Sequence, residues 1–176
     1  FMTVKTIFLD RDGVINKEVN YLSRIEDFEF IDGVFDACRH FEMLGYSIII
    51  ITNQSGIGRG YYSENDYQVL TKWMLSKFNE NNIEILDIFY CPHSPNNKCE
   101  CRKPKSGMFE MARDKHTIEM SKSWSIGDKE TDIEASTLSG ISNTILVRSG
   151  HKTQGSKSQA KYFLESIKES IKIIIS

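Results

Sequence analysis

Near its start the chain reads Thr6-Ile7-Phe8-Leu9-Asp10-Arg11-Asp12-Gly13. A short apolar run that ends abruptly at a charged residue is typical of a strand buried on both faces of a parallel sheet. We therefore predict a first strand over residues 6–9, with two carboxylates directly after its carboxyl end. Gly13 would allow the chain to turn sharply at that point.

Strand and helix patterns alternate along the rest of the chain. From Val34 apolar residues recur at helical spacing, and Gly45 follows where a C-terminal glycine is expected. The β-branched run at 47–51 then predicts a second buried strand. Further on we expect a helix capped by Ser63 and ending near Asn81, strands over 85–90, 124–126 and 145–147, helices over 107–115 and after Asp128, an edge strand over 162–164 and a closing helix over 166–174. This order predicts a doubly wound, mainly parallel α/β sheet of Rossmann-like type.

Length and composition narrow the class of protein. At ~100–200 residues per domain, the 176 residues predict one domain over 1–176. With 40% hydrophobic and 26% charged residues the chain can bury a core, which excludes default disorder. A net charge of −2 gives no basic surplus for nucleic acid. Because no apolar run suits a signal peptide or a membrane span, we expect a cytoplasmic protein with no membrane partner. We also expect a monomer.

Two parts of the chain stand outside this pattern. Phe1 precedes Met2 and is best explained as a residue left from expression, so we exclude it from the prediction. Residues 149–160 are rich in Ser, Gly, Lys and Gln and form the one linker-like stretch.

Polar residues collect where the predicted strands end, the edge at which doubly wound sheets carry their active crevice. Asp10 and Asp12 lie two residues apart and would repel each other unless a cation lay between them. Mg²⁺ suits such a pair because it takes oxygen ligands and keeps positions for water and substrate phosphate. Asp128 follows a later strand and can supply a third oxygen. A solvated turn with paired acids is the alternative.

Two further segments suit a phosphate group. Thr52-Asn53-Gln54-Ser55-Gly56 offers a hydroxyl, amides and backbone N–H groups at the same edge. Arg102-Lys103 supplies adjacent cations that could neutralise phosphoryl oxygens, or could be two surface charges. The glycines at 56, 58 and 60 do not indicate a dinucleotide loop, since that fingerprint belongs after the first strand.

Three of the four cysteines fall within residues 91–101. Cys91, His93, Cys99 and Cys101 together offer three sulfurs and one imidazole, which is a full tetrahedral set for Zn²⁺. Because four protein ligands would close the shell, such a zinc would be structural. A redox Cys-x-Cys pair or buried thiols would also fit the spacing. Cys38 lies on the apolar side of its predicted helix and is expected to be a core thiol.

The ordered combination is more specific than any one motif. The segments 9–16, 52–56, 101–104 and 126–129, together with the cysteine loop, resemble the haloacid-dehalogenase-like (HAD-like) phosphatases. Within them the chain is most similar to the D-glycero-D-manno-heptose 1,7-bisphosphate phosphatases and the related histidinol-phosphate phosphatases. The resemblance covers about residues 6–150 and implies zinc in the 91–101 loop, although the segment between His93 and Cys99 is short for the heptose enzymes.

The resemblance also assigns roles to residues. It implies that Asp10 is the nucleophile, that Asp12 is the general acid and base, and that Thr52 and Lys103 hold the transferring phosphoryl group. Mg²⁺ would be held by the Asp10 side chain, the Asp12 backbone carbonyl and Asp128. Substrate contacts carry over to Glu18, Val19, Asn20, Tyr21, Asn53, Gln54, Ser55, Arg102 and Lys129.

The implied reaction is removal of the 7-phosphate of the heptose bisphosphate through an aspartyl-phosphate, in the synthesis of ADP-heptose and lipopolysaccharide core precursors. Residues 13–46 hold only a loop and a helix, which leaves no room for a cap domain, so surface loops would set specificity. Arg102 and Lys129 suit a second phosphate and favour a sugar bisphosphate over a monophosphate.

Other functions stay open at this point. A histidinol-phosphate phosphatase shares the motifs and the zinc loop. A phosphoacceptor receiver or a non-catalytic zinc-stabilised binding module belongs to a different class, although a receiver would need neither Asp12 for leaving-group protonation nor a zinc loop. His151 has no motif around it and is expected to be an ordinary surface or core residue.

Overall fold

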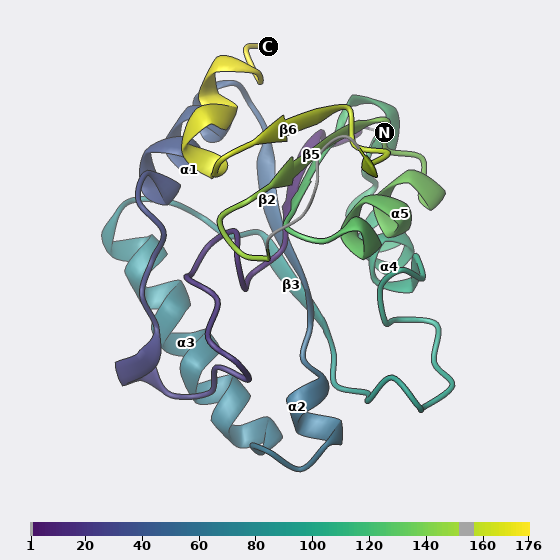
Figure 1. Cartoon of the computed structure of the whole chain (residues 1–176). Coiled ribbons are helices and arrows are strands. Elements are labelled where there is room, and N and C mark those ends of the chain that lie inside the picture. The colour runs from purple at the N-terminus through teal and green to yellow at the C-terminus, as the bar shows by residue number, and fades with distance from the viewer. Residues whose placement is uncertain (1, 152–156) are drawn as a thin grey trace.

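The computed structural model describes residues 2–151 and 157–176. Phe1 and part of the linker-like stretch, residues 152–156, lie outside the described residues. Within the described chain, six parallel strands form one sheet in the order β3-β2-β1-β4-β5-β6 (Figure 1). The strands are β1 (Thr6–Leu9), β2 (Ser47–Asn53), β3 (Asp87–Cys91), β4 (Trp124–Gly127), β5 (Asn143–Val147) and β6 (Tyr162–Leu164). The chain order reverses between β1 and β4, the switch point at which doubly wound sheets bind ligands. The predicted fold class is confirmed.

Helices cover both faces of the sheet. They are α1 (Val34–Met43), α2 (Ser55–Gly58), α3 (Glu64–Glu80), α4 (Gly107–His116) and α5 (Glu130–Leu138), with 3₁₀ helices at Ile25–Asp27, Met120–Lys122 and Ile167–Lys172. Figure 1 shows α1 and α3 on one side of the sheet and α4 and α5 on the other. Ser63 caps α3 with a reciprocal hydrogen-bond pair to Asp66, as the sequence predicts.

The core consists of two layers separated by the sheet. Ile7 and Leu9 of β1 pack with α1 and α3, whereas Phe8 between them packs with Phe109 of α4 on the opposite face. Because both faces of β1 are covered, Ile7, Phe8 and Leu9 are all apolar, and the buried hydroxyl of Thr6 at the start of the strand pairs with the hydroxyl of Ser47 at 3.0 Å. Cys38 is fully buried in the first layer, which confirms that it is a core thiol.

Three segments differ from the sequence-based expectation. Strand β3 begins at Asp87, two residues later than expected, where its pairing with Ile49 of β2 starts; Ile85 lies before the strand and packs on the core. The closing helix over 166–174 is a 3₁₀ helix at Ile167–Lys172. Residues 52–56, expected to follow the second strand, instead complete β2 at Asn53 and start the single helical turn α2 at Ser55.

No cap domain interrupts the described residues between β1 and β2, where residues 10–46 contain a loop, a 3₁₀ turn and α1. Residues 92–106, between β3 and α4, contain a loop without helix or strand. No helix in the described part of the chain is both long and apolar enough to cross a membrane.

Candidate active site

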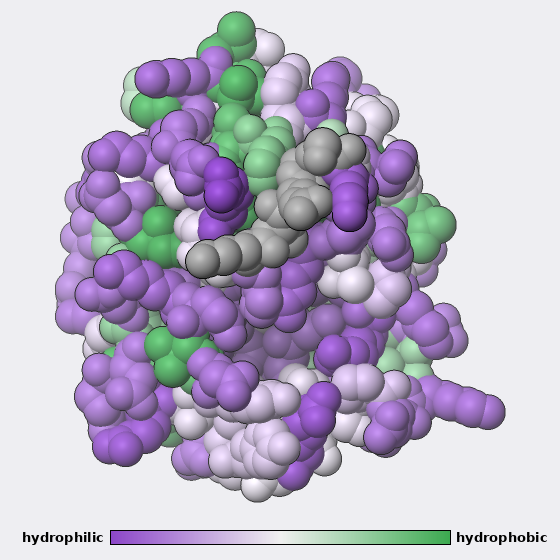
Figure 2. Space-filling view, in the orientation of Figure 1, coloured by the Kyte–Doolittle hydropathy of each residue, from purple (hydrophilic) through white to green (hydrophobic). Residues whose placement is uncertain are grey.

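A pocket of about 310 Å³ opens at the carboxyl ends of β1, β2 and β4. Figure 2 shows a recess of hydrophilic surface in this region. The predicted residues that line the pocket are Asp10, Asp12, Glu18, Val19, Asn20, Tyr21, Asn53, Gln54, Ser55, Arg102, Lys103, Asp128 and Lys129. The structure therefore brings together all the predicted nucleophile, general-acid and substrate-contact residues in one cavity. Thr52 is the exception, because it is buried and does not line the pocket.

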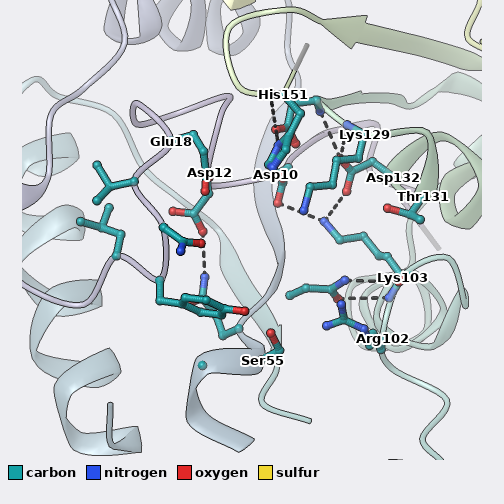
Figure 3. A pocket seen from close by; sticks show the side chains of 18 of the residues that line it. Asp10, Asp12, Glu18, Ser55, Arg102, Lys103, Lys129, Thr131, Asp132 and His151 are labelled. Atoms are coloured by element: carbon teal, nitrogen blue, oxygen red, sulfur yellow. Dashed lines mark hydrogen bonds and ion pairs between the residues drawn. The ribbon is translucent and has the colours of Figure 1, made fainter. Parts of the chain in front are cut away.

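Lys103 joins two carboxylates at the centre of the site (Figure 3). Its Nζ lies 3.1 Å from Asp10 Oδ1 and 2.6 Å from Asp132 Oδ1, and it also donates to the Ile51 carbonyl at 2.8 Å. Burial opposes the charge on Lys103, but Asp10 and Asp132 outweigh it and raise the pKa of the lysine. Burial and the neighbouring Asp132 hold the pKa of Asp10 well above its usual range. The lysine is therefore charged and holds the nucleophile candidate in place.

Asp132 is a site residue that sequence reasoning missed. It is buried, and its Oδ2 accepts hydrogen bonds at 3.1 Å from the backbone N–H groups of Asp128 and Lys129 at the start of α5. Its Oδ1 pairs with Lys103. The available signal was an acidic residue in the first turn of the helix that follows Asp128.

Asp128 is fully buried beside Asp10 and Asp132. Its Oδ2 accepts hydrogen bonds from the backbone N–H and the Nδ1 of His151, at 3.2 Å and 2.7 Å. Burial, aided by the charge of Asp132, raises the pKa of Asp128 to about 7. The interpretation of His151 as an ordinary surface or core residue is wrong, because the chain beyond β5 returns it to the pocket.

The acidic cluster fits a divalent cation. Asp10, Asp128 and Asp132 each offer an oxygen, and these oxygens lie within 4.8 Å of one another. Both oxygens of Asp132 are engaged, but Asp128 Oδ1 is buried and has no hydrogen-bond partner among the described residues. A buried oxygen without a donor is stabilised by a hard cation such as Mg²⁺. This geometry favours Asp10 and Asp128, rather than Asp132, as side-chain ligands.

Asp12 lies on the opposite side of Asp10 from Lys103 (Figure 3). Its Oδ1 accepts hydrogen bonds from Arg11 Nη2 at 2.9 Å and from Asn16 Nδ2 at 3.0 Å, and its Oδ2 accepts from Gln54 Nε2 at 3.1 Å. The side chain is 23% exposed, whereas that of Arg11 is 3% exposed. A buried cation thus anchors a carboxylate that still faces the pocket.

The carboxyl end of β2 supports its neighbours in the site as well as lining the pocket. Asn53 Oδ1 accepts from the Lys103 backbone N–H at 3.1 Å, and its Nδ2 donates to the Lys103 carbonyl at 3.3 Å, so Asn53 fixes the loop that carries the lysine. Thr52 Oγ1 accepts from Gln54 Nε2 at 2.8 Å. In this arrangement Thr52 supports Gln54 beside the pocket.

The rim combines cations, aromatic rings and a carboxyl group. The guanidinium carbon of Arg59 lies 5.7 Å from the centre of the Tyr21 ring. Tyr21 in turn packs edge-on against Tyr61, with their ring centres 4.6 Å apart. No sequence motif marks Arg59 as a site residue. Burial and the charge of Asp12 raise the pKa of Glu18. The other lining residues outside the predicted set are Leu22, Gly56, Tyr62, Thr131, Asp132 and His151.

The predicted zinc ligands converge. One ligand atom from each of Cys91, His93, Cys99 and Cys101 lies within 4.8 Å of the others. His93 Nδ1 is 3.4 Å from Cys91 Sγ and 3.2 Å from Cys101 Sγ, and the cysteines are not joined by disulfides. Three sulfurs and one imidazole nitrogen fit a closed, structural Zn²⁺ site. Arg102 and Lys103 directly follow the last ligand.

Gly13 offers a direct test of how closely the site is packed. It has φ +89°, and a Cβ there would overlap Asp128 Oδ2 and lie 2.8 Å from Gly150 Cα. We expect Gly13→Ala to lower the free energy of unfolding by about 2–4 kcal/mol, since it adds a clash to left-handed strain of about 1–2 kcal/mol. Urea unfolding measures this loss. Gly60→Ala is the matched control, because Gly60 has φ +77° but nothing within 4 Å of its Cβ position. Equal losses in the two variants would contradict the packing argument.

The fold and the site together define the class of HAD-like hydrolases. A family model described as HAD-hydrolase-like matches residues 100–170. A structure of D,D-heptose 1,7-bisphosphate phosphatase from B. bronchiseptica, complexed with magnesium and phosphate, superimposes with a TM-score of 0.88 at 24% identity, covering 97% of each chain. At that identity the likeness establishes the fold.

Comparison with curated relatives gives the family. The chain is 51% identical over 157 residues to D-glycero-alpha-D-manno-heptose-1,7-bisphosphate 7-phosphatase of Photorhabdus laumondii, covering 85% of this chain and 86% of the relative. It is 42% identical to D-glycero-beta-D-manno-heptose-1,7-bisphosphate 7-phosphatase of Vibrio cholerae, covering 96% and 95%. The chain belongs to the family of D-glycero-D-manno-heptose 1,7-bisphosphate 7-phosphatases, as the motifs predict.

Proposed function

We propose that this protein is a Mg²⁺-dependent phosphatase that removes the 7-phosphate of D-glycero-D-manno-heptose 1,7-bisphosphate. The observation that carries the proposal is the paired Asp10 and Lys103 next to Asp128, whose Oδ1 has no partner within residues 2–151 and 157–176, in a member of a family named for this reaction. A pocket of about 310 Å³ is large enough for a small phosphorylated sugar.

Asp10 attacks the 7-phosphorus in line, and the bond between phosphorus and the sugar oxygen breaks. Asp12 donates a proton to that departing oxygen and afterwards takes a proton from the water that hydrolyses the aspartyl-phosphate. Lys103 binds the phosphoryl oxygens while it keeps Asp10 oriented. Bound Mg²⁺, held by Asp10, Asp128 and the Asp12 carbonyl, would neutralise charge on the phosphate. Positioning and charge neutralisation are what phosphoryl transfer requires.

The rim favours a second phosphate over a cationic group. Arg59, Arg102 and Lys129 line the pocket in addition to Lys103, and Arg102 Nη1 is buried with no hydrogen-bond partner in the described chain. An arginine fork with free donors suits a phosphate and disfavours the cationic imidazole and amine of histidinol phosphate. The higher identity to the relative named for the alpha anomer favours that anomer as the substrate.

Phosphate release tests the substrate assignment against its alternative. With Mg²⁺ present, we expect kcat/KM for the heptose bisphosphate to exceed that for histidinol phosphate by at least ~10²-fold, because a site built for a buried polar group rejects substrates that leave it unpaired. The reverse order would make the protein a histidinol-phosphate phosphatase with the same chemistry. Turnover of neither compound would favour a phosphoacceptor or a non-catalytic module.

The cysteine loop is proposed to hold a structural Zn²⁺ that fixes Arg102 and Lys103. We expect one zinc per chain by elemental analysis, and faster proteolysis within residues 91–101 after chelation. Because the two cations then lose their support, kcat/KM should fall by about 10–100-fold when Mg²⁺ is resupplied alone. Full activity of zinc-free, Mg²⁺-replete protein would contradict this role.

We place the reaction in the synthesis of ADP-heptose for lipopolysaccharide core, carried out by a single-domain monomer in the cytoplasm. Sedimentation of the purified protein tests the monomeric state.

A further inference from the structure

The hydrogen bonds to Asp12 are distributed unequally between its two oxygens. Oδ1 accepts from Arg11 Nη2 at 2.9 Å, from Arg11 Nε at 3.3 Å and from Asn16 Nδ2 at 3.0 Å. In the described chain Oδ2 accepts only from Gln54 Nε2, at 3.1 Å. Since Oδ1 is fully occupied by donors, Oδ2 is the oxygen with room for a proton.

Gln54 is itself held in one orientation. Its Oε1 accepts from the hydroxyl of Tyr62 at 2.6 Å, and its Nε2 donates both to Asp12 Oδ2 and to Thr52 Oγ1. Rotating the amide by 180° would place Oε1 against the carboxylate of Asp12 and lose that hydrogen bond. Gln54 is 3% exposed and Tyr62 is 9% exposed, so water cannot easily replace these contacts.

The backbone is built to admit this contact. Gly56 lies in α2, between Gln54 and Tyr62 in sequence, and a Cβ on Gly56 would overlap Cε1 of the Tyr62 ring. A glycine at this position therefore lets the ring pack against the helical turn and bring its hydroxyl to Gln54. The hydrogen bonds therefore run from Tyr62 to Gln54 and from Gln54 to Asp12, the general-acid candidate.

We propose that Tyr62 and Gln54 form a positioning pair that aims Oδ2 of Asp12 at the leaving-group oxygen. This inference rests on the proposed function, in which Asp12 protonates that oxygen. As the bond from Asp10 to phosphorus forms and the bond from phosphorus to the sugar oxygen breaks, the proton on Oδ2 moves to the sugar oxygen. Gln54 keeps its hydrogen bond to Oδ2 throughout, and Tyr62 keeps the amide from turning.

Leaving-group dependence separates this role from a purely structural one. A sugar alkoxide needs a proton to depart, whereas p-nitrophenolate does not. We expect Tyr62→Phe to lower kcat/KM for the heptose bisphosphate by about 5–20-fold. The fold-loss for p-nitrophenyl phosphate should be smaller than that by a factor of at least about three. Gln54→Glu, which turns the donor into an acceptor facing Asp12, should show the same selectivity with a larger loss.

Tyr46→Phe is the matched control. Tyr46 is also buried, and its hydroxyl donates to the Ser176 carbonyl at 2.6 Å, away from the pocket lining. The Tyr46→Phe variant loses a comparable hydrogen bond, and it should leave kcat/KM for both substrates nearly unchanged. If Tyr62→Phe lowers both kcat/KM values equally, or neither, the positioning role is overturned.

Asp12→Asn, assayed on the same two substrates, separates the general-acid role of Asp12 from the positioning role of Tyr62 and Gln54. If Asp12→Asn loses activity selectively on the sugar phosphate but Tyr62→Phe does not, only the positioning role of Tyr62 and Gln54 is contradicted. Equal losses on both substrates in Asp12→Asn would remove the general-acid role itself, and with it this inference. Selective loss in all three variants supports both.

Discussion

Asp10→Asn should lower kcat by more than ~10³-fold while leaving the fold intact, because an amide oxygen cannot replace the carboxylate nucleophile. The variant should be as stable as the parent protein or more stable. Burial and the charge of Asp132 hold the pKa of Asp10 well above its usual range, so the folded protein bears a cost for the charge that Asn removes. Phosphate release and urea unfolding measure the two effects.

Asp114→Asn is the control for this experiment. Asp114 is exposed and pairs only with the adjacent Arg113 among the described residues, so neither turnover nor unfolding should change. Normal turnover in Asp10→Asn would remove Asp10 as the nucleophile. A lost fold would show that the charge of Asp10 is structural.

Lys103→Met should have the largest combined effect on stability and activity. Lys103 is 3% exposed and pairs with Asp10 and Asp132, so its removal leaves the buried Asp132 and the largely buried Asp10 without a cation. We expect a loss of about 3–5 kcal/mol in the free energy of unfolding. Activity should also fall by about 10²–10³-fold, since a phosphoryl-binding cation is lost.

The instability of Lys103→Met should depend on pH in a definite direction. The pKa of Asp10 is already raised in the folded protein, and losing the lysine raises it further. A carboxyl group whose pKa is higher in the folded state than in the unfolded state favours folding at low pH and loses that contribution as pH rises through the folded value. The variant should therefore be closer to the parent protein at pH 5 than at pH 8.

Two further variants show whether the loss of stability in Lys103→Met comes from the buried carboxylates. Lys105→Met is the control, because Lys105 is half exposed and contacts the exposed Glu100 and the Cys99 carbonyl instead of a buried carboxylate. The double variant Lys103→Met with Asp132→Asn removes one of the stranded charges and should recover part of the lost stability. A loss that is independent of pH, or equal to that of Lys105→Met, would contradict the role of Lys103 as a buried counter-ion.

The sequence was sufficient to predict the site residues that stand directly at strand ends or close together in one loop. Asp10 follows β1 and Asp128 follows β4, and parallel neighbouring strands bring their carboxyl ends to one edge. The cysteine loop could be predicted because its ligands fall within a short segment. The alternation of buried strands and helices was likewise visible in continuous apolar runs.

The positions of other site residues depend on contacts between elements, which residue spacing along the sequence does not predict. Asp132 reaches Lys103 because α5 begins at Glu130 and its first turn directs the Asp132 side chain toward the sheet edge. His151 arrives through the loop after β5, which has no periodic pattern. Thr52 was predicted to hold phosphate, but its hydroxyl bonds to Gln54 instead of lining the pocket. The helical turn α2 was missed because its glycines predict a loop.

Phosphorus NMR of the reaction on each anomer of D-glycero-D-manno-heptose 1,7-bisphosphate shows which phosphate leaves and how fast each anomer reacts. With Mg²⁺, we expect the alpha anomer to be consumed faster and only the 7-phosphate signal to be replaced by free phosphate, leaving heptose 1-phosphate. Faster consumption of the beta anomer would overturn the anomer assignment alone. Loss of the 1-phosphate, or no reaction with either anomer, would contradict the proposed function.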